Sequence, residues 1–189
     1  MRNVKKFFCM GVFVLCVVSF NAFAQESGLV IGTSGEVSFI SDAPLEIIKA
    51  ESTKLAGVIN TNDRSFRFQI PMSSFQGFNS ALQKTHFNEN YIETAKFPNA
   101  VFEGKIIEDV DFSETGTINV RAKGTFSVHG VDQDRIIRSK MIIQKGEIQV
   151  SAEFRVPLED HDIKIPSIVS QKIAEEIFVE ISITLVEKK

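Results

Sequence analysis

Apolar and polar residues alternate along much of this chain, in runs long enough to form the strands of a β-sheet. The clearest run is 118–128, where every second residue from Ile118 to Val128 is apolar or glycine and those between are polar. Because neighbouring side chains of a strand point to opposite faces, each run predicts a strand with one buried face. Seven other runs cover 36–39, 55–59, 65–70, 100–107, 132–144, 148–156 and 177–186.

One segment, 77–106, interrupts this series with a helical pattern. Residues 81–84 (Ala-Leu-Gln-Lys) favour a helix, and Asn79 or Ser80 has the side chain of a helix N-cap. The Phe97-Pro98 pair forces an extended backbone and ends the helix. The pattern predicts a short helical lid that leads into the next strand.

A second break lies between 158 and 175, near the end of the chain. Pro166 excludes a regular strand there, and Ile168, Val169 and Ile173 have helical spacing. We expect a second short helix that plugs one end of the fold.

Eight antiparallel strands with one apolar face hide their edges best by closing on themselves. The predicted fold is therefore all-β, an eight-stranded antiparallel barrel, whose interior holds side chains or one slender ligand. A two-sheet sandwich is the alternative architecture.

The N-terminal 24 residues have the pattern of a cleavable signal peptide. Three basic residues precede the apolar run Phe7 to Phe20, and Ala22-Phe23-Ala24 forms a small-residue cleavage site. The run is shorter than the roughly 20 residues that span a bilayer, so we expect no stable membrane insertion. Residues 25–189 then form one exported domain, periplasmic or secreted.

The composition of 25–189 narrows the possible partners. Both cysteines, Cys9 and Cys16, precede it, so it has neither a disulfide nor a thiolate ligand. Its 18 Lys and Arg against 24 Asp and Glu give a net charge of −6, and the absence of a basic surplus argues against nucleic-acid binding. Twelve Phe beside a single Tyr predict an oily interior.

Residues with catalytic or metal-binding chemistry are few. The three histidines, His86, His129 and His161, lack the spacing of a metal site, and the string Asp160-His161-Asp162 offers few ligands. No Gly-x-Ser-x-Gly nucleophile motif occurs. We therefore predict no enzyme activity, no metal and no tightly held cofactor.

The order of the motifs resembles that of a known family. A polar helix, Phe97-Pro98, a Phe-containing strand and the string Gly-x-Phe-x-Val-x-Gly at 124–130 occur in the order seen in the YceI-like family of periplasmic polyisoprenoid-binding proteins. The resemblance extends over nearly all of 25–189 and implies a lipocalin-like barrel that binds an isoprenoid lipid. The string 82–87 (Leu-Gln-Lys-Thr-His-Phe) lacks the Arg and acidic residue of the family pattern.

This resemblance and the strand pattern together define a candidate site. The resemblance implies that the protein binds, stores or transports a polyprenyl chain or an isoprenoid quinone. We expect the protein to be a monomer or a homodimer. The expected apolar lumen consists of Phe39, Phe66, Phe68, Ile70, Phe102, Ile118, Val120, Phe126, Val128, Ile148, Val150, Phe154, Ile181 and Ile183. The expected lid and mouth residues are Leu82, Gln83, His86, Phe87, Asn88, Tyr91 and Phe97.

A different function follows if the phenylalanines fill the lumen themselves. The chain would then be a structural or stress-related interaction module of the cell envelope without a ligand. The two hypotheses differ in whether the lumen beneath Phe66, Phe68, Phe102 and Phe126 is open or packed to the density of an ordinary protein interior.

Overall fold

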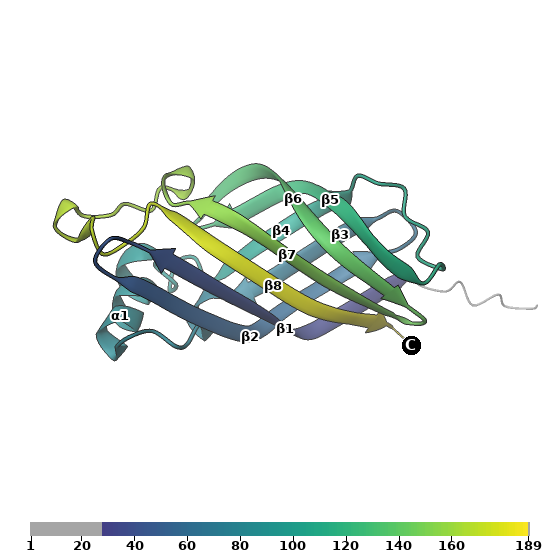
Figure 1. The fold of residues 1–189 in the computed structure, drawn as a ribbon, viewed down its shortest axis with the longest axis horizontal. Helices are drawn as coiled ribbons and strands as arrows, with labels where there is room; N and C mark the ends of the chain where they lie inside the picture. The colour runs from purple at the N-terminus through teal and green to yellow at the C-terminus, as the bar shows by residue number, and fades with distance from the viewer. Residues whose placement is uncertain (1–27, 189) are drawn as a thin grey trace, which may run out of the picture.

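Eight antiparallel strands close into a barrel in this computed structural model, which describes residues 28–188 (Figure 1). Each strand pairs with the next in sequence, and β8 returns to pair with β1. This order confirms the predicted barrel and excludes the sandwich. The strands are β1 (Leu29–Asp42), β2 (Ile47–Asn60), β3 (Ser65–Pro71), β4 (Asn99–Ile106), β5 (Gly116–Val128), β6 (Val131–Gln144), β7 (Glu147–Pro157) and β8 (Glu176–Glu187).

The first two strands are longer than their alternation predicts. β1 begins at Leu29 rather than near Glu36. Its pairing with β2 shifts register between Gly32 and Val37, which breaks the alternation, and for this reason the sequence pattern did not predict the first part of the strand. The predicted signal peptide, 1–24, lies outside the described residues.

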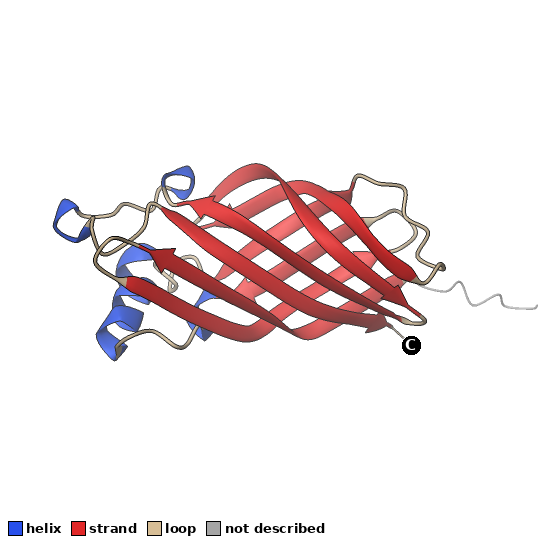
Figure 2. Ribbon diagram, in the orientation of Figure 1, coloured by secondary structure: helices blue, strands red, loops and turns tan. Residues whose placement is uncertain are grey.

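The predicted helical lid joins β3 to β4 and covers one end of the barrel (Figure 2). It comprises η1 (Met72–Ser74), α1 (Ala81–His86) and a π-turn, η2 (Phe87–Tyr91). Ser80 is the N-cap of α1, and its hydroxyl accepts a hydrogen bond from the Gln83 amide at 3.1 Å. The name "lid" below refers to residues 72–98.

The second helical region consists of two single turns, η3 (Glu159–His161) and η4 (Ser167–Val169), between β7 and β8. Ile168 does not plug the barrel, because its side chain is 90 % exposed. Helical spacing over so few residues cannot specify which side faces the protein, since one turn of 3₁₀-helix has no long apolar stripe.

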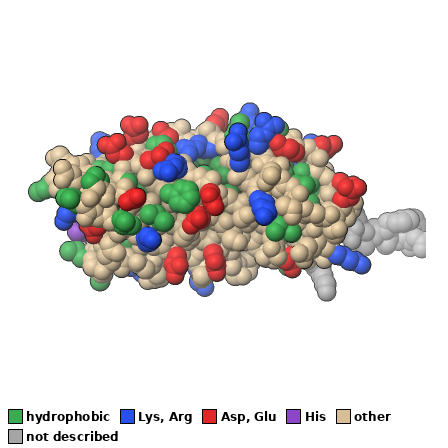
Figure 3. Space-filling model, viewed as in Figure 1, with side chains coloured by type: hydrophobic (Ala, Val, Ile, Leu, Met, Phe, Trp, Pro, Cys, Tyr) green, Lys and Arg blue, Asp and Glu red, His purple; other side chains and the backbone are tan. Residues whose placement is uncertain are grey.

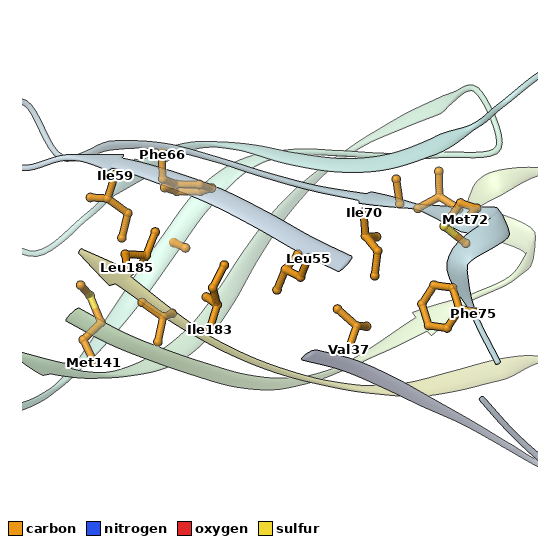
Figure 4. Packing of buried hydrophobic residues seen from close by; sticks show 14 of the residues in the cluster. Val37, Leu55, Ile59, Phe66, Ile70, Met72, Phe75, Met141, Ile183 and Leu185 are labelled. Carbon is orange, nitrogen blue, oxygen red and sulfur yellow. The ribbon is translucent and has the colours of Figure 1, made fainter. Parts of the chain in front are cut away.

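The half of the barrel farther from the lid is filled by side chains. Ile59, Met141 and Leu185 are 1 %, 1 % and 0 % exposed, and they lie in the same interior as Phe66 and Ile183 (Figure 4). Burial of this apolar cluster stabilises a domain that has no disulfide.

The barrel wall is not held by strand pairing everywhere. β6 pairs with β7 only from Ser139 to Gln144, so 131–138 have a strand neighbour on one side alone. The loop 158–163 covers this gap: Gln133 donates to the Asp160 carbonyl at 2.6 Å, and Arg135 binds the Asp160 carboxylate and the Arg155 carbonyl. We name this part of the wall the β6–β7 gap.

Candidate ligand-binding site

A cavity of about 500 Å³ opens at the lid end of the barrel. Its volume falls within the roughly 300 to 1,000 Å³ of typical small-molecule sites. Most of its lining is apolar and comes from the strand ends, the lid and the segment between β7 and β8. The strands and their ends contribute Val37, Phe39, Ser41, Ile48, Ile70, Ala100, Phe126, Val128, Val156, Leu158, Ile177 and Val179.

Four phenylalanine rings form one wall of the cavity. Phe39 of β1 meets three rings of the lid, with centroid distances of 5.3 Å to Phe75, 6.0 Å to Phe78 and 5.6 Å to Phe87. Phe78 and Phe87 are themselves 5.1 Å apart. Such contacts add to the burial energy of each ring and attach the lid to the barrel without polar groups.

Polar groups lie at the mouth of the cavity. Glu46, in the turn between β1 and β2, accepts a hydrogen bond from the side-chain amide of Gln83 at 3.0 Å, which joins this turn to α1. His86 and Lys172 also line the mouth. Leu82 is 63 % exposed there, so an apolar side chain faces solvent at the entrance.

Tyr91 adds a hydroxyl to the cavity lining. Burial raises the pKa of Tyr91 above its ordinary value of 10.0. At neutral pH the phenol is therefore protonated and offers a hydrogen-bond donor to a polar ligand group.

The far end of the lid is attached to the barrel through His129, in the β5–β6 turn. Its Nε2 lies 3.0 Å from a carboxylate oxygen of Glu93, and its Nδ1 lies 2.9 Å from the carbonyl oxygen of His161. Phe97 packs edge-on against the His129 ring, with centroids 4.9 Å apart, and covers Gly130. Three segments distant in sequence therefore meet beside the cavity.

His161 is fully buried behind this contact. Its Nδ1 donates to the carbonyl of Val131 at 3.3 Å, while its Nε2 has no hydrogen-bond partner among residues 28–188, and its ring lies 5.4 Å from that of Phe126. Desolvation lowers the pKa of His161 below its ordinary value of 6.5, so the neutral form is favoured.

Residues 29–185 match the profile of the YceI-like domain. The chain belongs to the YceI-like family. Comparison with curated proteins gives no match.

Solved structures of low sequence identity share this YceI-like barrel. A polyisoprenoid-binding domain from Saccharophagus degradans is 14 % identical with a TM-score of 0.70, over 85 % of this chain and 99 % of that one. Burkholderia cenocepacia BcnA is 11 % identical with a TM-score of 0.65, over 79 % and 95 %. The Campylobacter jejuni YCEI protein is 16 % identical with a TM-score of 0.59, over 74 % and 85 %. These likenesses show a shared fold.

The structure brings together nine of the residues predicted for the site of this YceI-like protein. They line the cavity: Phe39, Ile70, Phe126 and Val128 from the barrel, and Leu82, Gln83, His86, Phe87 and Tyr91 from the lid. Asn88 instead uses its amide to donate to the Lys84 carbonyl, and Phe97 packs on His129.

The other predicted lumen residues do not line the cavity. They lie farther down the strands: Phe66, Phe68, Phe102, Ile118, Val120, Ile148, Val150, Phe154, Ile181 and Ile183. Of these, Val120 and Ile181 line a second hollow, described below. Alternation predicts correctly which side of a strand faces inward but contains no information on depth along the barrel. Contact of any of these residues with a ligand stays a prediction.

Several lining residues were missed because they lie outside the regular strands. Phe75 and Phe78 precede α1, and Leu158, Ile163, Val169 and Ile173 belong to the segment between β7 and β8. Val169 and Ile173 were predicted as part of the helical plug but not as site residues. The signal that could have found the first two is the density of aromatic residues within and just before the predicted helical segment 77–106.

The structure also separates the string Asp160-His161-Asp162. Asp160 pairs with Arg135 at 3.3 Å, whereas the His161 ring points into the buried gap. Within 28–188, no group of three or more His, Cys, Asp and Glu side chains is placed to hold a metal ion.

A second, larger hollow of about 1,070 Å³ follows one row of paired residues across β2, β1, β8, β7, β6 and β5, from Ser52 through Val37 to Val120. Its lining includes charged side chains of both signs, among them Glu51, Glu180, Arg121 and Arg138. Acidic and basic side chains are likewise interspersed on the face seen in Figure 3. This lining does not suit an apolar chain, and we take the smaller cavity as the candidate site.

Proposed function

We propose that this chain binds an isoprenoid lipid, a polyprenyl chain or an isoprenoid quinone, for its storage or transport. The observation that carries this proposal is the apolar cavity that opens beneath the lid of a YceI-like barrel. A structural neighbour described as a polyisoprenoid-binding domain supports the same ligand class.

The cavity lining suits recognition through the lipid tail. Each buried methylene group contributes about 0.8 kcal/mol before the entropic cost of binding. Phe39, Ile70 and Val128 offer only apolar surface, so they favour a hydrocarbon chain without requiring a particular head group. This explains how the family's Arg and acidic pattern at 82–87 can be absent without loss of tail binding.

We further propose that the protein works in the periplasm as a binding protein without catalytic activity. The sequence of 1–24 supports export, as a signal peptide would provide. In the part of the chain that the structure describes, no helix is both long enough and apolar enough to cross a bilayer.

Mass spectrometry of an organic extract tests the proposal directly. Protein 25–189 should be exported by a bacterial host and purified without added lipid or detergent, so that a bound lipid is not exchanged. The purified protein is then extracted with an organic solvent. We expect one prenyl lipid or quinone in near-stoichiometric amount. Folded protein that yields no lipid, and takes up no added quinone, would instead favour the ligand-free module, which the filled half of the barrel also supports.

A matched pair of variants makes this experiment specific to the cavity. Ile70→Asp puts a carboxylate on the cavity wall, whereas Ile136→Asp makes the same change at a side chain that is 57 % exposed on the outside. We expect lipid to be lost from the first and retained by the second, with circular dichroism used to establish that both are folded.

A further inference from the structure

The floor of the cavity is a layer of aromatic rings. Ile70, Ala100 and Val156 line the cavity on β3, β4 and β7, and the next inward residue on each strand is a phenylalanine that does not line it. These three residues are Phe68, Phe102 and Phe154.

Two further rings connect this layer across the barrel. Phe66 lies between Phe68 and Phe102, with centroid distances of 5.8 Å and 4.9 Å. Phe126 lies between Phe102 and Phe154, at 6.2 Å and 5.9 Å. The five rings form a continuous row from β3 to β7, which we name the aromatic floor.

The backbone of the adjacent strand β2 makes room for this floor, because Gly57 pairs directly with Phe68 of β3. A Cβ atom on Gly57 would lie 2.3 Å from the Phe68 ring, so only glycine permits the ring to lie there. Beneath the floor, Met141 and Leu185 are 1 % and 0 % exposed, so packed side chains fill this part of the lower barrel.

We propose that the aromatic floor, with Phe102 at its centre, limits the length of lipid tail that the barrel accepts. This inference rests on the proposed function and specifies the ligand. If a carbon group occupies roughly 30 Å³, the share of a water molecule in the liquid, the cavity holds about 15 to 20 carbons. That is the tail of a farnesyl or geranylgeranyl lipid, and the remainder of any longer chain stays outside the mouth.

Binding of prenyl alcohols of increasing length tests this limit. Geraniol, farnesol, geranylgeraniol and solanesol would each compete with a fluorescent fatty-acid probe for the protein 25–189. We expect affinity to rise about tenfold or more with each isoprene unit up to geranylgeraniol, because each unit buries new apolar surface. Between geranylgeraniol and solanesol we expect less than about a twofold gain, because the added units remain in solvent.

Replacing Phe102 with a smaller residue should let a longer lipid tail enter the barrel. In Phe102→Ala the affinity of solanesol should exceed that of geranylgeraniol by about tenfold, and Phe102→Leu should give a smaller change in the same direction. Met141→Ala, which also removes a buried side chain but lies below the floor, should keep the wild-type limit.

The outcomes separate the two proposals. An affinity that keeps rising to solanesol in the wild-type protein overturns the floor and leaves isoprenoid binding intact. Failure of every alcohol to compete overturns isoprenoid binding itself, and the floor with it. The wild-type series distinguishes these outcomes even if a variant does not fold.

Discussion

Nε2 of His129 lies 3.0 Å from a carboxylate oxygen of Glu93, and both residues have left-handed backbone conformations, with φ of 53° and 50°. Such conformations are uncommon for residues other than Gly, Asn, Asp and His, so Glu93 is the less usual of the two. Nδ1 of the same ring lies 2.9 Å from the carbonyl oxygen of His161. The contact thus joins the lid to the β5–β6 turn and to the loop 158–163.

Replacing His129 should loosen the lid without disrupting the turn. His129→Asn is the informative variant, because Asn followed by Gly130 is a preferred pair for a two-residue hairpin in which both residues have positive φ. We expect a loss of about 1 kcal/mol in the free energy of unfolding and faster hydrogen exchange in 87–97. Unchanged exchange in that segment would show that the ring does not hold the lid.

The buried His161 should make stability depend on pH. The pKa of His161 is lower in the folded protein than in the unfolded chain. As the pH falls below 6.5, the unfolded chain therefore binds a proton at His161 while the ring in the folded protein stays neutral. The contribution of neutral His161 is therefore complete above its unfolded pKa and falls as the pH decreases toward the folded pKa.

Urea unfolding of the wild type and His161→Asn across this range measures the effect. Asn keeps a donor for the Val131 carbonyl but does not titrate. We expect the wild type to lose stability relative to the variant between about pH 7 and pH 5. A difference in unfolding free energy between the two proteins that stays constant over this range would contradict the lowered pKa of His161.

The hydrogen bond between Glu46 and Gln83 should slow movement of the lid at the mouth. Glu46→Ala removes the acceptor and, at a half-buried site, should lower stability by about 1 kcal/mol. We expect release of a bound fluorescent prenyl probe, followed by stopped flow, to become several-fold faster. Glu89→Ala removes an exposed carboxylate from the same lid and should leave the rate unchanged.

Tyr91→Phe should distinguish ligands by their polar groups. The protonated hydroxyl offers a hydrogen bond to a quinone oxygen, worth about 1 kcal/mol, or about fivefold in affinity. We expect the variant to bind a prenyl quinone about fivefold more weakly than the wild type and to bind squalene with the affinity of the wild type. Equal losses for both ligands, measured by isothermal titration calorimetry, would indicate a packing role for Tyr91.

The sequence was sufficient to predict the barrel because alternation acts over whole strands. Runs such as 118–128 specify the inward face directly, and Ser80 and Pro98 mark the lid by their local chemistry. The depth of the site could not be predicted in this way. Phe126 and Phe102 are equally apolar and equally inward, but only Phe126 reaches the cavity, because strand tilt and ring packing decide which level is open.

The β6–β7 gap gives this barrel two concealed strand edges. Residues 131–138 of β6 and 153–157 of β7 each carry backbone groups that no partner strand occupies on that side, and the loop 158–163 shields them. A free strand edge is a template for pairing with another chain. Cleavage or displacement of this loop would therefore expose both edges to pairing with strands of another chain.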